Sequence, residues 1–119
     1  MGYRTSAYHF YGIHVPADQW VEEDHPMAEG ERIDMIVRAL AQDARDIGHV
    51  TAGNYDRDML FLVASGDDGV LEVKLGTFRC VSGDQAARPE WDRQLRRVAD
   101  AMGYKLPGEP GWITVPDLS

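Results

Sequence analysis

The chain has 119 residues, of which 44% are hydrophobic and 27% are charged, and this ordinary globular composition predicts one soluble domain spanning residues 1–119. Aspartate and glutamate outnumber lysine and arginine by 20 to 12, and the net charge of −8 disfavours direct binding to nucleic acid or to an anionic membrane. No apolar run approaches the roughly 18 residues of a membrane span, and no secretion signal is recognised. We therefore expect a cytoplasmic protein.

Residues 5–15 are aromatic and β-branched enough to predict a long first strand. The alternation of side chains along a strand places His9 and Tyr11 on one face and Phe10 and Gly12 on the other. Apolar groups on both faces indicate a strand well inside the sheet. Gly12 predicts a bulge or a close approach between two backbones.

Residues 16–30 form an expected loop that is rich in carboxylates and contains no lysine or arginine. A helix is expected to begin near Pro26, because proline is favoured in a first turn. Apolar residues recur after it at helical spacing, at Ile33, Ile36, Val37, Leu40, Ala44 and Ile47. Gly48 is well placed to end this helix in the left-handed conformation.

Three strand candidates follow, at residues 49–55, 59–65 and 70–75, the last continuing through 77–81. The second is continuously apolar, which is typical of a central strand. The segments Asp56–Asp58 and Gly66–Gly69 have the residues of tight turns, so an antiparallel meander is expected. A second helix is expected over residues 89–102 with Gly103 at its end, and then a short edge strand over residues 112–115.

The element order β-α-β-β-β-α-β predicts an α+β domain. Its antiparallel sheet is expected to have four to five strands and to carry both amphipathic helices on one face. Strands joined by tight turns must be antiparallel, because a parallel pair needs a long crossover connection.

The sequence contains no diagnostic catalytic, phosphate-binding or metal-binding motif. The four histidines lack metal-ligand spacing, and Cys80 is the only cysteine, so no disulfide, cofactor or metal is expected. Four arginines of the second helix, Arg88, Arg93, Arg96 and Arg97, are expected to form an exposed, salt-bridged face. The sequence leaves enzymatic activity open and favours a non-enzymatic protein.

The first functional hypothesis is that the acidic segment Asp18–Glu31 binds and modulates a partner protein. In this hypothesis Trp20 is an exposed anchor, and a basic partner, or one that itself binds nucleic acid, is steered by the surrounding carboxylates. Those carboxylates belong to Asp18, Glu22, Glu23 and Asp24. A second reading of Trp20, in which its ring folds back over the core, stays open.

Two alternatives belong to other functional classes. The domain is a small enzyme or ligand-binding protein if a partly polar pocket exists near His9 and Tyr11 on the face of the first strand. It is a homo-oligomeric structural component, for instance of a virion, if the edges at residues 70–81 or 112–115 pair between copies. A homodimer is compatible with each of the three hypotheses.

The two ends of the chain carry a resemblance. The segments Tyr8–Val15 and Gly108–Trp112, with the preference for ten arginines over two lysines, resemble small proteins of GC-rich actinobacterial and actinophage genomes. This resemblance implies no activity, but small phage and accessory proteins often bind a host or defence component, and the first hypothesis is therefore of an inhibitor or immunity-type protein in the bacterial or phage-infected cytoplasm. The resemblance implies no catalytic residue.

Overall fold

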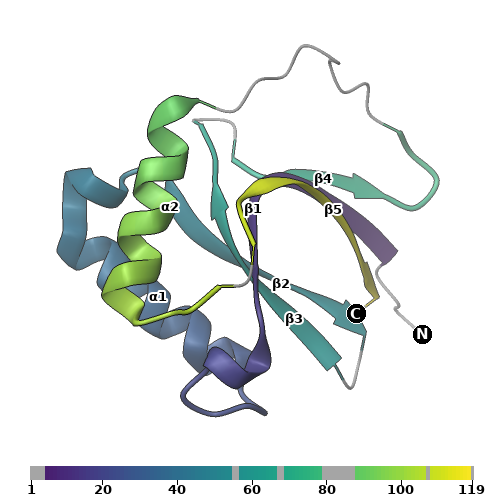
Figure 1. Cartoon of the computed structure of the whole chain (residues 1–119). Helices are drawn as coiled ribbons and strands as arrows, with labels where there is room; N and C mark the ends of the chain where they lie inside the picture. Colours follow the sequence, from purple (N-terminus) through teal and green to yellow (C-terminus); the bar gives the residue numbers. More distant parts are fainter. Residues whose placement is uncertain (1–4, 55–56, 67–68, 79–87, 107, 119) are drawn as a thin grey trace.

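The computed structural model describes residues 5–54, 57–66, 69–78, 88–106 and 108–118. Helices α1 (Pro26–Leu40) and α2 (Pro89–Met102) lie on the same side of a five-stranded antiparallel sheet (Figure 1), which confirms the predicted α+β architecture. The strands are β1 (Thr5–Val15), β2 (Ile47–Asn54), β3 (Arg57–Ala64), β4 (Leu71–Lys74) and β5 (Gly111–Leu118). Within the described residues, no helix is long and apolar enough to cross a membrane.

Strand β1 is the centre of the sheet because it pairs along both of its edges. One edge of β1 pairs with the whole of β5, from Thr5 to Gly12. The other edge pairs first with β4, where His9 lies opposite Leu71, and then with β3, where Tyr11 lies opposite Ala64. A step of two residues along β1, from His9 to Tyr11, therefore corresponds to a step of seven residues along the facing chain, from Leu71 to Ala64. Strands β3 and β4 are two halves of one interrupted strand.

This pairing corrects the expected meander. The apolar strand β3 is central, as predicted, and lies between β2 and β1. However, β4 pairs with β1 and not with β3, so the segment Gly66–Gly69 belongs to an excursion that returns to the same edge of β1. Turn-forming residues indicate where a strand stops, but they do not specify which strand the chain joins next. The expected extension through residues 77–81 is absent at Thr77 and Phe78, and its other positions lie outside the described residues.

The main core lies between the helices and the sheet. Ile33 of α1 and Leu95 of α2 are at most 1% exposed, and they pack against side chains of β1 and β3 such as Val15 and Leu60. At Gly12 the two strands come so close that a Cβ atom would lie 2.2 Å from the carbonyl oxygen of Leu62. The close approach predicted at this glycine is thereby confirmed.

A second, smaller core covers the face of the sheet that carries no helix (Figure 1). Phe10 and Phe61 meet there edge to face with 5.3 Å between ring centroids, and Val115 packs beside them. The sheet curls until β2 approaches β5, and the amide of Gly53 donates a hydrogen bond of 3.1 Å to Asp117 Oδ1. The sheet thus buries much of its second face by folding over itself.

The two helices end differently. Helix α2 ends at Gly103 with φ of 77°, as predicted. Helix α1 ends at Leu40, because Ala41 adopts φ of 51° and a short 3₁₀ turn over Ala41–Ala44 follows. The prediction that Gly48 ends this helix is wrong, since Gly48 lies within β2. The last two apolar positions of the expected stripe, Ala44 and Ile47, are buried, but they lie in the 3₁₀ turn and in β2. Helical spacing alone therefore overstated the length of the helix.

Candidate functional site

A hollow of about 350 Å³ opens where β3 gives way to β4. Only Phe10 of β1 lies between His9, which pairs with β4, and Tyr11, which pairs with β3. Three elements, β1, α2 and β5, contribute four rings to its lining, and one guanidinium group lies beside them; these residues are His9, Tyr11, Trp91, Trp112 and Arg88. The volume lies within the range of small-molecule sites.

The rings of the hollow form one contacting cluster around Trp112. His9 stacks on Trp112 with 5.3 Å between centroids and planes inclined by 6°. Tyr11 and Trp91 meet the same indole edge to face, with centroids at 5.5 Å and 6.4 Å. Trp91 is 7% exposed and Trp112 is 39% exposed. Trp112 therefore offers ring surface to a ligand, while the buried ring of Trp91 packs against Trp112.

Hydrogen bonds fix the two polar rings that come from β1. His9 Nδ1 lies 2.9 Å from Thr114 Oγ1, a hydrogen bond between neighbouring strands. The hydroxyl of Tyr11 donates to Asp92 Oδ1 over 2.5 Å. Burial, this hydrogen bond and the negative charges of Asp92 and Glu109 raise the pKa of Tyr11 to about 12. Tyr11 therefore stays protonated at neutral pH and acts as a donor.

Arg88 supplies the positive charge of the hollow. It caps the start of α2, and its Cζ lies 5.4 Å from the centroid of the Trp91 ring, which is cation–π geometry. Gly66 leaves room for it, because a Cβ atom there would lie 3.0 Å from Arg88 Nη2. The four arginines of this helix are exposed as predicted. In the described part of the chain, none of them forms the predicted salt bridge.

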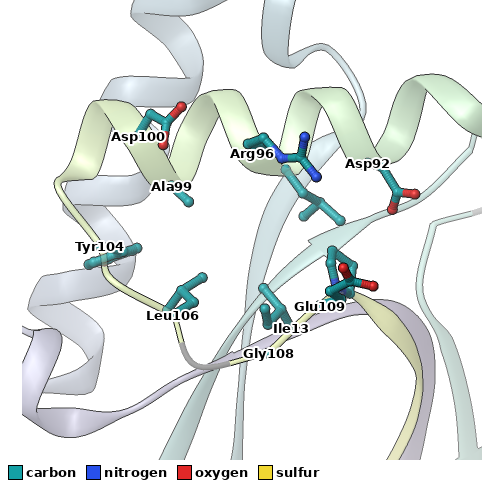
Figure 2. A pocket seen from close by; sticks show the side chains of 11 residues that line it. Ile13, Asp92, Arg96, Ala99, Asp100, Tyr104, Leu106, Gly108 and Glu109 are labelled. Atoms are coloured by element: carbon teal, nitrogen blue, oxygen red, sulfur yellow. The ribbon is translucent and has the colours of Figure 1, made fainter.

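A second hollow of about 180 Å³ lies between α2 and the segment leading into β5 (Figure 2). Its apolar lining includes Ile13, Leu95 and Leu106. Charged side chains surround this lining from both walls, with Asp92, Arg96 and Asp100 on α2 and Glu109 on the facing segment. Asp92 lines this second hollow, and Tyr11 lines the first hollow. The hydrogen bond between their side chains therefore connects the two hollows.

The candidate anchor Trp20 is buried, with 8% of its surface exposed, and its indole N–H donates to the carbonyl oxygen of Val15 over 3.0 Å. The prediction of an exposed anchor at Trp20 is therefore wrong. A large apolar ring is more stable over the core than in water. The carboxylates of Asp18, Glu22, Glu23 and Asp24 are exposed, and the apolar side chains exposed among them are Val21 and Met27.

Glu29 belongs to the same acidic segment but is 2% exposed. It accepts hydrogen bonds from the hydroxyl of Tyr104, from the amide of Val21 at 3.0 Å, and from Arg32 Nη1 at 2.8 Å and 3.0 Å. Burial alone raises the pKa of Glu29, but these donors outweigh it and hold the pKa below its ordinary value. This cluster ties the loop, α1 and the end of α2 together, which is a structural role.

The structure brings together the predicted pair His9 and Tyr11 with three residues that the sequence analysis placed elsewhere. Trp91 lay within the expected second helix, Trp112 in an edge strand and Arg88 on a solvent-exposed face. No local spacing links Trp91 or Trp112 to the pair on β1, because the pairing of β5 with β1 brings Trp112 there and the packing of α2 against the sheet brings Trp91. Among the described residues, no cluster of histidine, cysteine or carboxylate side chains is arranged to hold a metal ion.

No family model matches the chain, and neither a curated protein nor a solved structure matches it significantly. The features of the structure that point to a function are the two hollows and the acidic segment.

Proposed function

We propose that the chain is a small-ligand-binding domain whose ligand occupies the hollow between β3 and β4. The observation that carries this proposal is the convergence of four rings and one guanidinium group, which has no carboxylate partner among the described residues, at the place where the chain facing β1 passes from β3 to β4. This interruption departs from regular strand pairing, and local departures from the rules of stable folding are typical of functional sites. A concave site with a few converging polar groups is the ordinary form of a ligand pocket.

Binding is favoured over catalysis by the groups that line the hollow. A general base at neutral pH needs a pKa near the working pH. Tyr11 does not meet this requirement, because its pKa is about 12 and its hydroxyl donates to Asp92. His9 is stacked on Trp112 and bonded to Thr114, an arrangement suited to holding a ring in place.

The test is a screen of aromatic fragments by ligand-observed NMR, with dissociation constants measured by calorimetry. Trp112→Ala removes the most accessible ring of the hollow and is expected to weaken binding at least tenfold, since tenfold corresponds to about 1.4 kcal/mol and stacking on an aromatic ring contributes up to about 3 kcal/mol. The matched control is Phe78→Ala, because Phe78 is 83% exposed and does not line the hollow. Equal affinity in both variants would place the ligand elsewhere.

A second function is favoured by a separate observation on the acidic segment Asp18–Glu31. Val21 is 68% exposed and Met27 is 73% exposed, and both lie in a carboxylate-rich segment that contains no lysine or arginine before Arg32. We propose that this surface binds and modulates a basic partner protein, as an inhibitor or immunity-type protein does. Val21 and Met27 take the anchoring role that Trp20 cannot fill, and the carboxylates accelerate encounter.

This second function is tested by comparing proteins captured by the wild type with those captured by two variants. One variant replaces Glu22, Glu23 and Asp24 by alanine, and the other replaces Val21 and Met27 by serine. The control is Met35→Ser, because Met35 is also 68% exposed but lies on α1 beyond the segment. A stoichiometric basic partner lost by both variants and kept by the control is expected. A partner kept by all would argue against this surface.

A further inference from the structure

Among the residues that the structure describes, Arg88 has no carboxylate partner, and the arrangement of Asp92 gives a reason. Asp92 lies four residues further along α2, and oppositely charged side chains at this spacing commonly attract each other. However, Asp92 accepts the hydrogen bond of Tyr11, and no ion pair joins it to Arg88. The guanidinium group therefore remains available beside the hollow, held over Trp91 by cation–π attraction.

The same guanidinium group determines which charge the hollow accepts. A cage of aromatic rings attracts cations when its ring faces are free. Here Arg88 already occupies the side of Trp91, so a second cation entering the hollow meets like-charge repulsion. Arg88 is also the only lining residue of the hollow, within the described chain, that is charged irrespective of pH. An anionic group is therefore the complementary one.

The ring geometry determines the shape of the ligand. The stacked rings of Trp112 and His9 are nearly parallel, with 6° between their planes, and Trp112 is 39% exposed. The open part of such a parallel pair offers a flat surface, on which a planar ring stacks with more contact than a puckered ring. The volume of about 350 Å³ accommodates one ring system with a single substituent.

We propose that the ligand of this hollow is a planar aromatic or heteroaromatic anion, whose ring stacks beside Trp112 and whose carboxylate or phosphate pairs with Arg88. This inference rests on the proposed ligand-binding function and specifies the ligand class. The guanidinium fork matches either anion in a bidentate arrangement. The anion is expected to point away from Tyr11, because Asp92 and Glu109 carry negative charge on that side.

The test uses five defined probes in calorimetric titrations of the full chain. Indole-3-carboxylate and adenosine monophosphate are anions with a planar ring, which carry a carboxylate directly on the ring and a phosphate through a ribose. Indole is the neutral planar control, tryptamine is the planar cation, and cyclohexanecarboxylate is the non-planar anion. The two planar anions are expected to bind at least tenfold more tightly than the three controls. The better of the two identifies the source of the anion, and either order supports the inference.

Arg88→Gln is the matched variant, and Arg97→Gln on the same helix is its control for net charge. Arg88→Gln is expected to weaken the planar anions at least tenfold, since hydrogen bonds to charged groups are the strong ones, and to leave the affinity for indole unchanged. Arg97→Gln is expected to leave both affinities unchanged, because Arg97 does not line the hollow.

The failures are distinguishable. Tryptamine binding as tightly as indole-3-carboxylate would overturn the anion preference while keeping the proposed function. Cyclohexanecarboxylate binding equally well would overturn the requirement for a planar ring. Absence of binding by all five probes, together with no hit in the fragment screen, would overturn both the inference and the proposed function.

Discussion

Two clusters of this molecule each combine an arginine with aromatic side chains, and their surroundings are opposite. In the cluster of Glu29, Arg32 and Tyr104, the buried carboxylate accepts every donor that surrounds it. In the hollow, Arg88 lies over Trp91 without a described carboxylate partner, and the ring of Trp112 is partly open to solvent. Saturated polar groups hold elements together, whereas unsatisfied groups at a cavity retain binding capacity.

This comparison predicts that mutations in the two clusters affect different properties. Substitutions at the Glu29 cluster should lower the stability of the fold, and ligand affinity should suffer only as far as the fold is lost. Substitutions at the hollow should lower ligand affinity while the fold persists.

Glu29→Ala is expected to lower the free energy of unfolding by about 3 kcal/mol, because it leaves the buried hydroxyl of Tyr104 and the amide of Val21 without an acceptor. Urea denaturation followed by circular dichroism measures this change. Glu31→Ala is the control, since Glu31 is an exposed neighbour on the same helix and should cost less than about 0.5 kcal/mol. Equal effects of the two substitutions would remove the structural role of Glu29.

The same cluster predicts acid sensitivity. The pKa of Glu29 is held below its ordinary value of 4.5 in the folded chain, so the folded state favours the ionised carboxylate. The stability it contributes is fully present above pH 4.5 and is lost as the pH falls through the lower, folded pKa. We expect wild type and Glu29→Gln to converge in unfolding free energy as the pH is lowered from 6 to 3. A constant difference across this range would contradict the assignment.

The fold was largely predictable because its signals are local. Alternation along residues 5–15, helical spacing after Pro26 and the glycine at residue 103 each depend on near neighbours, and the corresponding elements are formed. The pairing partner of β4 was not predictable, because a turn sequence does not encode which strand edge is free. Helix α1 was expected to be too long for a similar reason, since an apolar stripe continues smoothly into a following turn and strand.

The candidate site was predictable only in part. His9 and Tyr11 were identified as pocket residues because two polar rings on the face of a central strand are unusual. Arg88 and Trp112 lie far from them in sequence, and only the pairing of β5 with β1 brings Trp112 to this hollow. At Trp20 the loop sequence alone did not distinguish an exposed anchor from a ring that covers the core.

Trp112→Ala is expected to separate the two clusters more sharply. The indole loses edge-to-face contacts with Tyr11 and Trp91 and a stacked contact with His9, but it is already 39% exposed. We therefore expect a loss of about 1–2 kcal/mol in unfolding free energy, less than for Glu29→Ala, with a loss of ligand binding of at least tenfold. Thermal unfolding and calorimetric titration on the same preparation measure both quantities. A larger stability cost than that of Glu29→Ala would make Trp112 a structural residue first.

Arg88→Gln gives the smallest expected change in stability and tests the comparison most directly. Arg88 is exposed and unpaired in the described chain, so its removal costs only its cation–π contact with Trp91, about 0.5–1 kcal/mol at an exposed site. The corresponding arginine of the other cluster bonds a buried carboxylate, so Arg32→Gln should cost more. Urea denaturation of the two variants side by side decides the order. If Arg88→Gln were the more destabilising of the two, Arg88 would be a structural cap of α2, and its availability for a ligand would lose its support.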